Sequence, residues 1–305
     1  MLRLKREVTN QCRLLHTHVC RFFEVGLTAE QPASAETRLD GRERLYLVFE
    51  FADSGTLQQH LARSGGRLDE TWARWFMQQL VFGLAHSHAR GVFNRDIKPE
   101  NLLLDGSSGA MLLKVSDFGL CKACSESLPN SRVGSPVYMA PEVLDLQHGG
   151  RYDGRKADVF SCGATLFQML FGVPPYNRHP ADKRTLDHRN HADFKQLIDN
   201  MRHERWLALL PSGVEPPGPE LAGLLAGMLR FDPNQRMSLG DVKRHAWYQK
   251  GLSADALAVV LADEPPNQEP QAQLDFTYIM DRWRRAKAAQ QARYEEEVEA
   301  GVYDD

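Results

Sequence analysis

The stretch "FNRDIKPEN", residues 93–101, decides how this chain is interpreted. Within seven positions it places an arginine, an aspartate, a lysine, a glutamate and an asparagine. This set suits phosphoryl transfer, because a carboxylate takes the hydroxyl proton, a lysine neutralises phosphate charge and an amide oxygen holds a metal ion. A polar loop between two buried elements is the simpler alternative, and nine residues alone leave both interpretations open.

The composition is that of an ordinary soluble globular protein. The chain has 305 residues, of which 42% are hydrophobic and 25% charged, with a net charge of −3. This length predicts one large domain or two small ones. The charge balance does not indicate a nucleic-acid surface, and no apolar run approaches the roughly 18 residues of a membrane span. We therefore expect neither nucleic acid nor membrane among the partners.

The cysteines and the N-terminal residues indicate a reducing compartment. Five scattered cysteines, an odd number in a long chain, do not fit a disulfide framework. The first twenty residues contain no continuous apolar segment and do not form a signal peptide. We expect a cytoplasmic and/or nuclear protein. The pair Cys121 and Cys124 raises a redox or zinc alternative, but no second ligand pair has suitable spacing.

Hydrophobic periodicity predicts a mixture of strands and helices. β-Branched and aromatic residues predict strands at 19–27 and 44–52, and a hairpin formed by 101–105 and 111–117. Helical spacing is found over residues 3–16, 68–91, 156–172, 220–231 and 238–248. A Pro/Gln-rich stretch then predicts a linker.

Further motifs follow "FNRDIKPEN" in a set order. Asp117-Phe118-Gly119 comes at the end of the predicted hairpin, where an aspartate can face a metal that bridges two phosphates. "MAPE" at 139–142, "ADVFSCG" at 157–163 and "DPNQR" at 232–236 come next. Five such elements in this order are very unlikely to arise by chance, which removes the polar-loop alternative.

With these motifs, residues 3–250 resemble a eukaryotic serine/threonine protein kinase catalytic domain. The stretches "LKREVTNQCRLLHTHVCRFFEV" and "SLPNSRVGSPVYMAPEVL" are similar to the plant stress-kinase branch of the calcium/calmodulin-dependent and sucrose-non-fermenting-related group. The resemblance implies an α+β bilobal fold with a truncated small lobe and a mainly helical large lobe. Its expected parts are a partial small lobe with helix C, two strands and the hinge at 1–52, a large lobe at 53–250, a linker at 251–272, and a C-terminal helix and acidic tail at 273–305.

The resemblance also implies catalytic roles, with ATP and Mg²⁺ as cofactors. Asp96 would orient the substrate hydroxyl and accept its proton, and Lys98 would lie against the γ-phosphate. Asn101 and Asp117 would hold the magnesium ions. The implied substrates are serine and threonine side chains of proteins, and an upstream kinase is the expected activator.

Other residues match the nucleotide, regulatory and structural positions of that family. Arg95 would bind a phosphate on the activation segment. The implied nucleotide residues are Glu7, which pairs with the ATP-binding lysine, the gatekeeper Phe49, Glu50 and Ala52 along the adenine edge, and Leu103 on the pocket floor. The implied phosphosites are Ser127 and Ser131. The structural positions are Glu142, Asp158 and Arg236.

Three departures from the pattern matter, and one of them is Gln11, where many kinases have an apolar side chain. No glycine-rich loop and no lysine-bearing strand precede Glu7 in the sequence as written, and losing one preorganised donor commonly costs about 10²–10³ in rate. Asn94 stands where the family usually has histidine, so we expect a looser junction there. Two functions remain open: a serine/threonine kinase, and a kinase-like binding module that transfers no phosphate.

Overall fold

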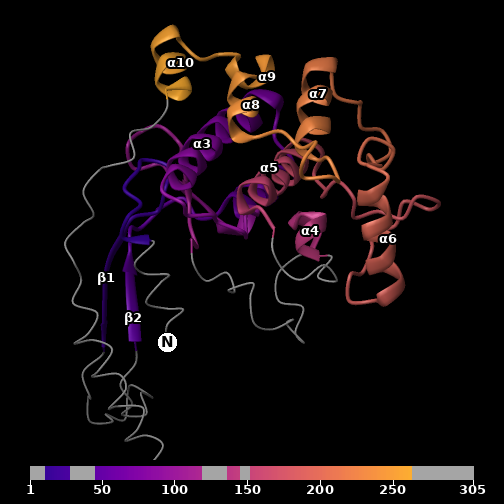
Figure 1. The fold of residues 1–305 in the computed structure, drawn as a ribbon, viewed down its shortest axis with the longest axis horizontal. Coiled ribbons are helices and arrows are strands. Elements are labelled where there is room, and N and C mark those ends of the chain that lie inside the picture. Colours follow the sequence, from indigo (N-terminus) through magenta and orange to yellow (C-terminus); the bar gives the residue numbers. More distant parts are fainter. Residues whose placement is uncertain (1–10, 28–44, 119–135, 145–151, 263–305) are drawn as a thin grey trace, which may run out of the picture. The chain divides into compact units, whose positions relative to one another are not determined.

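The computed structural model describes residues 11–27, 45–118, 136–144 and 152–262 (Figure 1). The predicted residues Glu7, Ser127 and Ser131 lie outside this part, as do Cys121 and Cys124. The chain forms two compact units, one of residues 1–20 and 51–268 and the other of 21–50 and 269–305. This division differs from the predicted boundary at residue 52, because residues 11–20 group with the helical unit.

In the described part of the smaller unit, two strands form an antiparallel pair. β1 (Phe22–Leu27) pairs with β2 (Leu45–Phe49), with an irregularity between Phe22 and Glu24. Both strands were predicted and are confirmed. Gly26 lies opposite Tyr46, and a Cβ at this position would come within 2.4 Å of the tyrosine ring. The missing side chain lets the Tyr46 ring lie over this position.

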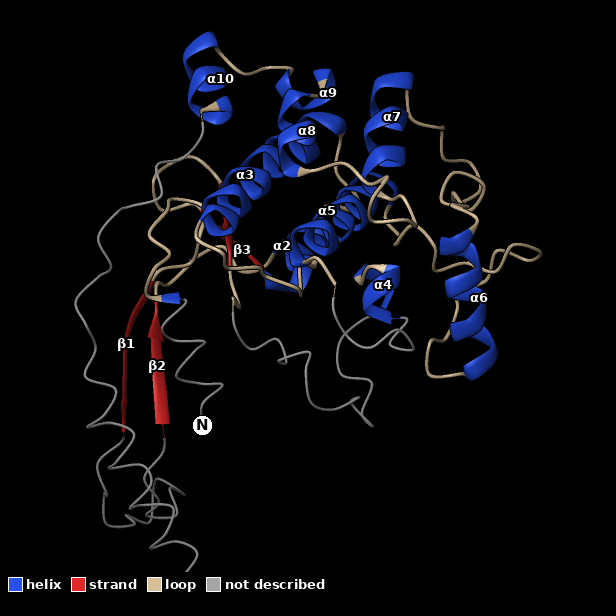
Figure 2. Ribbon diagram, in the orientation of Figure 1, coloured by secondary structure: helices blue, strands red, loops and turns tan. Residues whose placement is uncertain are grey.

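The larger unit is mainly helical, which together with the strands confirms the α+β class (Figure 2). Two helices are central and well capped. Asp69 is the N-cap of α3 (Glu70–Ala89), and Gly172, whose φ is 77°, is the C-cap of α5 (Gly154–Phe171). The other helices are α2 (Leu57–Arg63), α4 (Pro141–Leu144), α6 (His191–Arg202), α7 (Pro219–Met228), α8 (Leu239–Arg244), α9 (Ala246–Gln249) and α10 (Ala254–Leu261), with 3₁₀ turns η1 (Pro99–Asn101) and η2 (Pro136–Tyr138).

Helix α5 is the core of this unit. Fifteen of its eighteen residues are buried, as expected for a helix that is apolar on all sides. It packs against α3 and α7, which lie beside it in Figure 1. At the contact with α7, a Cβ on Gly163 would come within 2.9 Å of the Cβ of Met228. The missing side chain lets these two helices approach closely.

The predicted helices at 68–91, 156–172 and 220–231 are confirmed as α3, α5 and α7. The prediction over 3–16 is wrong at its end, because residues 12–16 are turn and coil. There the backbone N–H of Leu14 bonds to the Gln11 carbonyl, and the Gln11 side chain donates to the Cys20 carbonyl at 3.0 Å. These bonds turn the chain and bury Leu14, while Leu15 stays 45% exposed.

Other differences also concern helices. The predicted helix at 238–248 is divided into α8 and α9 by His245, whose backbone is extended. Helix α6 was not predicted, because its segment is polar and short of apolar residues. Helix α10 occupies part of the predicted linker at 251–272. No helix among the described residues is both long enough and apolar enough to cross a bilayer.

The predicted hairpin is confirmed as β3 (Leu102–Asp105) and β4 (Leu112–Val115). Leu102 pairs with Val115, so residues 101 and 116 lie at the same end of the hairpin. Val19 pairs in parallel with Val115, which explains why residues 18–20 belong to the helical unit. This hairpin end carries the candidate site.

Candidate functional site

The loop 93–101 connects α3 to β3 and is anchored by a carboxylate from α5. Asp158 is fully buried, and its Oδ2 accepts hydrogen bonds from the backbone N–H of Asn94 at 2.9 Å and from Nε2 of His88 at 2.8 Å. Its Oδ1 accepts from the backbone N–H of Arg95 at 2.7 Å. The predicted structural residue Asp158 thus fixes the start of the loop.

Asp96 lies at the centre of a compact polar group. Its Oδ2 accepts hydrogen bonds from Nζ of Lys98 at 2.6 Å and from Nδ2 of Asn101 at 2.8 Å. The same Asn101 nitrogen also contacts the Asp96 carbonyl at 2.9 Å. Oδ1 of Asp96 makes no hydrogen bond to the described residues, so it is available to a hydroxyl group. Three of the predicted residues therefore meet in one cluster.

The hairpin brings Asp117 to this cluster. The carbonyl of Asn101 accepts hydrogen bonds from the backbone N–H of Ser116 at 3.1 Å and from its Oγ at 2.7 Å. Asp117 is the next residue, is half-buried and has a φ of 62°. Arg95 also has a positive φ, 68°. Non-glycine residues with positive φ are uncommon, and strained backbone conformations cluster at functional sites.

The donor groups at this place fit a magnesium ion. Mg²⁺ prefers carboxylate and amide oxygens and completes its shell with phosphate and water oxygens. Asp117 supplies a carboxylate, and Oδ1 of Asn101 accepts no hydrogen bond from the described residues because Nδ2 is turned to Asp96. No group of three or more His, Cys, Asp or Glu side chains in the described part could hold a metal on its own. Two protein ligands plus phosphate oxygens match this chemistry.

The predicted nucleotide residues are divided between the two units. Phe49 ends β2, and the backbone N–H of the following Glu50 donates to the Arg21 carbonyl at 2.8 Å. Ala52 and Leu103 belong to the helical unit, where Leu103 on β3 pairs with Thr56. Phe49 is thus at the end of a strand, Leu103 is within β3, and Ala52 lies outside the strands.

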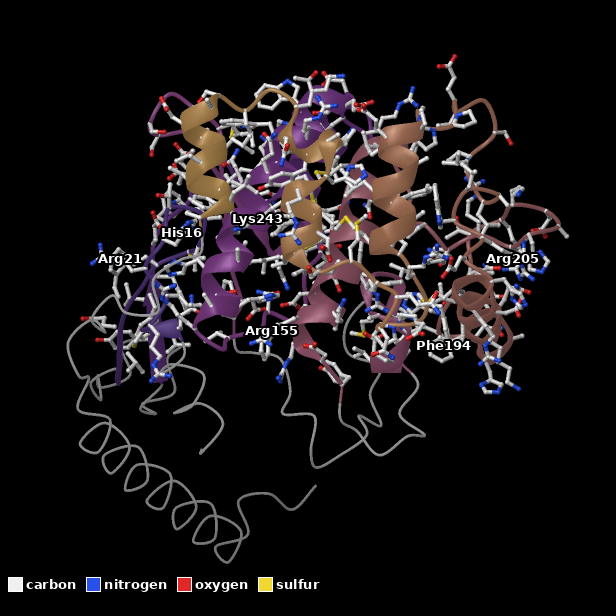
Figure 3. All side chains as sticks on the ribbon, turned by 45° about the horizontal axis from the view of Figure 1, so that its top comes forward. His16, Arg21, Arg155, Phe194, Arg205 and Lys243 are labelled. Atoms are coloured by element: carbon white, nitrogen blue, oxygen red, sulfur yellow. The ribbon has the colours of Figure 1, made fainter. Side chains whose placement is uncertain are left out.

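Two arginines contact the same aromatic ring. The Arg95 guanidinium lies 5.9 Å from the centroid of Phe93, and that of Arg155 lies 5.5 Å from it (Arg155 is labelled in Figure 3). A Cβ on Gly154 would come within 2.8 Å of this ring, so the glycine lets Phe93 pack on the start of α5. Neither guanidinium forms an ion pair with a residue that the structure describes.

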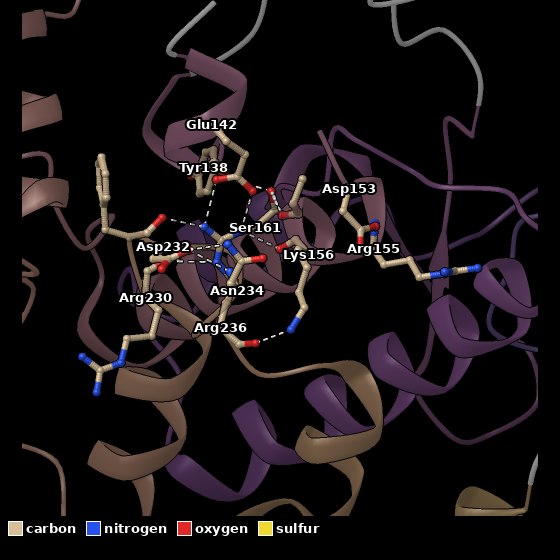
Figure 4. A network of polar contacts seen from close by, with 12 residues as sticks. Tyr138, Glu142, Asp153, Arg155, Lys156, Ser161, Arg230, Asp232, Asn234 and Arg236 are labelled. Carbon is tan, nitrogen blue, oxygen red and sulfur yellow. Dashed lines mark hydrogen bonds and ion pairs between the residues drawn. The ribbon is translucent and has the colours of Figure 1, made fainter. Parts of the chain in front are cut away.

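Glu142 and Arg236 form the predicted ion pair (Figure 4). The contact is bidentate, with N–O distances of 2.7 and 2.9 Å, and the Arg236 side chain is completely buried. Arg236 also donates to the carbonyls of Arg230, Lys156 and Phe231. With so many bonds, this pair holds the loop before α8 against α4 and the start of α5.

The expectation of a looser junction at Asn94 is wrong. The residue is 1% exposed and hydrogen-bonded at both ends of its amide. Nδ2 donates to the carbonyl of Ser116 at 3.0 Å, and Oδ1 accepts from the backbone N–H of Asp96 at 3.2 Å. Sequence reasoning missed the roles of His88 and Ser116. The place of Ser116, directly before Asp117 at a strand end, was the available signal.

A family model described as "protein kinase domain" matches residues 2–248. The chain belongs to the protein kinase family. It is 36% identical to serine/threonine-protein kinase SRK2B of Arabidopsis thaliana over 258 residues, which are 84% of this chain and 63% of that protein. It is also 36% identical to SRK2A of Physcomitrium patens, over 88% of this chain and 70% of that protein.

A third relative is serine/threonine-protein kinase SAPK9 of Oryza sativa subsp. japonica, 36% identical over 83% of this chain and 62% of that protein. The chain therefore spans somewhat less than two thirds of the length of SRK2B and SAPK9. Membership of the family implies ATP and typically Mg²⁺, which agrees with the donor groups on Asn101 and Asp117.

Proposed function

We propose that this kinase domain transfers the γ-phosphoryl group of ATP to serine and threonine hydroxyls of protein substrates. One observation carries the proposal. Asp96, Lys98 and Asn101 are joined by direct hydrogen bonds, and Asn101 is bonded to the residue that precedes Asp117. Phosphoryl transfer depends on such positioning of a base, a cation and metal ligands more than on covalent chemistry.

Each residue has a distinct task in this proposal. The free Oδ1 of Asp96 orients the substrate hydroxyl and takes its proton. Lys98, which contacts the other carboxylate oxygen, extends its charge toward the transferred phosphoryl group. Asn101 and Asp117 hold Mg²⁺, which when bound neutralises charge on the phosphate oxygens. By resemblance to the family, Ala52 and Leu103 are the proposed nucleotide contacts of the helical unit, and Phe49 and Glu50 are those of the smaller unit, with Glu7 at a further family position.

Regulation by phosphorylation belongs to the same proposal. Arg95 would bind a phosphate on Ser131. Ser127 would be a second phosphorylation site, and an upstream kinase would add these phosphates. The location of Arg95 supports this role, because Asp158 fixes its backbone while its guanidinium has no carboxylate partner in the described part. A phosphoserine carries about −1.5 to −2 charges and pairs well with arginine.

We also propose a narrower kinase group and a cellular location for this protein. The three relatives named above are plant kinases, which supports the stress-kinase branch of the calcium/calmodulin-dependent and sucrose-non-fermenting-related group. We propose a cytoplasmic and/or nuclear location, on the basis of the cysteine pattern of the sequence.

The test is phosphorylation of a serine peptide by the purified chain with Mg·ATP. We expect activity that requires Mg²⁺ and falls by about 10²–10⁴ in Asp96→Asn, the usual contribution of a general base. Nucleotide binding is measured in parallel by calorimetry. If wild type and Asp96→Asn give the same background phosphorylation, the enzyme proposal is wrong and the binding-module alternative takes its place.

A further inference from the structure

The Asn94 side chain connects two parts of the site that are distant in the sequence, the loop that carries Asp96 and the residue Ser116 after β4. Its Oδ1 accepts from the N–H of Asp96 and its Nδ2 donates to the carbonyl of Ser116, with the side chain fully buried between them. Its own backbone N–H is held by Asp158. An amide carries a donor and an acceptor on one carbon, so a single short side chain satisfies an N–H on one side and a carbonyl on the other.

The bond to Ser116 acts on the next residue. The carbonyl of Ser116 lies in the peptide plane that also contains the nitrogen and Cα of Asp117. Fixing this plane fixes the direction from which the chain enters Asp117, and Asp117 has the strained φ of 62°. A strained conformation persists only where its surroundings hold it in place. The Asn94 amide and the two bonds from Ser116 to the Asn101 carbonyl supply this support.

We propose that Asn94 is a positioning residue that couples the loop carrying Asp96 to the peptide preceding Asp117. The buried amide keeps the proton acceptor and the metal-binding carboxylate in register. Histidine, which is usual at this position in the family, is replaced here by a group that makes both contacts. The catalytic consequence rests on the proposed kinase function, whereas the structural coupling does not.

The test compares Asn94→Leu with a matched control, Asn200→Leu. Leucine keeps the approximate shape of asparagine and removes both hydrogen-bonding groups. Asn200 is also fully buried, and its Nδ2 donates to the carbonyls of Tyr176 and Arg178 at 2.9 Å. It neighbours Arg205, which Figure 3 shows well away from Arg155 at the start of α5. Both variants remove an equivalent buried amide, but only one touches the site.

We expect both substitutions to lower the melting temperature, and Asn94→Leu alone to change the chemistry. In Asn94→Leu, kcat should fall and the Mg²⁺ concentration needed for half-maximal activity should rise, each by about 10–100-fold, as for other groups that orient metal ligands. The KM for the peptide should change by less than about threefold, because the substitution acts on the chemical step and not on peptide binding. Equal kcat and Mg²⁺ dependence in Asn94→Leu and wild type would overturn the proposal.

Hydrogen exchange supplies a readout that needs no activity. Amides in segments 94–101 and 114–118 should exchange faster in Asn94→Leu than in wild type and Asn200→Leu. If Asn94→Leu does not fold, Asn94→Asp serves instead, since it keeps the acceptor for Asp96 and removes the donor to Ser116. If the wild-type protein transfers no phosphate, the kinase proposal is wrong, but hydrogen exchange still tests the coupling by Asn94. Unchanged exchange in both segments would contradict this coupling.

Discussion

Oδ1 of Asp158 accepts a hydrogen bond from the backbone N–H of Arg95 at 2.7 Å, across 63 positions of the sequence. Arg95 is one of four described non-glycine residues with a positive φ. The bond therefore ties a strained backbone to α5, a helix that is buried over most of its length. Asp96 follows directly, so the position of its carboxylate depends on an anchor in α5.

Replacing Asp158 by alanine should damage both stability and activity. Three donors, on His88, Asn94 and Arg95, would lose their acceptor, and each buried donor left unpaired costs about 1–3 kcal/mol. We expect a large fall in the free energy of unfolding, measured with urea, and a loss of peptide phosphorylation. Asp182→Ala removes an exposed carboxylate and should leave both unchanged. Normal stability in Asp158→Ala would contradict the anchoring role.

Much of the fold and of the candidate site could be predicted from the sequence. The buried helices α3 and α5 have long apolar patterns, and the motifs at 93–101 and 117–119 carry residue types that phosphoryl transfer requires. The register of the hairpin then follows from its short length. Local sequence patterns predict an element well when the residues of that element alone determine its structure.

The remaining features depend on contacts between distant residues. The chain leaves the helix before residue 12 because the Gln11 side chain bonds to Cys20, and no periodicity contains this information. Helix α6 is polar, and its place is held by Asn200 and Asp193, which bond to the preceding loop. Asn94 resembled a weakening substitution in the sequence, whereas its partners on both sides make it a bridge.

Substitution of Lys98 by methionine should impair the chemical step selectively. Nζ of Lys98 lies 2.6 Å from the Asp96 carboxylate, and methionine keeps the length of the side chain without its charge. We expect kcat to fall by about 10²–10³, the usual loss for one preorganised charge-stabilising group, with the affinity for ATP changed little. Steady-state kinetics check this. Lys195→Met, at an exposed position of α6, is the control, and an equal loss there would contradict the assignment.

The Glu142–Arg236 pair should behave as a structural contact. Arg236→Met leaves the Glu142 carboxylate without its partner, and breaking a buried pair costs about 3–5 kcal/mol. The double variant Glu142→Gln/Arg236→Met should be more stable than Arg236→Met alone, because no unpaired charge remains. Chemical denaturation measures four proteins: wild type, Glu142→Gln, Arg236→Met and the double variant. If the double variant is the least stable by the sum of both single losses, the two residues are not coupled.

The acid stability of the α6 region should depend on Asp193. Hydrogen bonds from the Arg184 guanidinium, and then from the backbone of Asp187, lower the pKa of Asp193 from 3.8 to about 2. A lowered folded-state pKa gives stability that is present above the unfolded pKa and is lost as pH falls toward 2. The difference in melting temperature between wild type and Asp193→Asn should be constant from about pH 5 to 7 and narrow below about pH 4. Arg184→Gln should show the same window, and a difference that widens in acid would contradict this sign.

The arrangement at Phe93 predicts that two arginines share the response to phosphorylation. Arg95 and Arg155 contact the same ring, and neither has a carboxylate partner in the described part of the chain. A bond to a charged group is worth about 1.5–3 kcal/mol, so Arg95→Gln should reduce the stimulation by an upstream kinase about tenfold or more. Arg155→Gln should reduce it by a smaller factor and leave the basal rate of unphosphorylated protein unchanged. Peptide assays before and after phosphorylation, with Ser131→Ala and the surface variant Arg202→Gln alongside, measure these effects. Full stimulation in Arg95→Gln would exclude Arg95 as the phosphate ligand, and full stimulation in Arg155→Gln would restrict the site to Arg95.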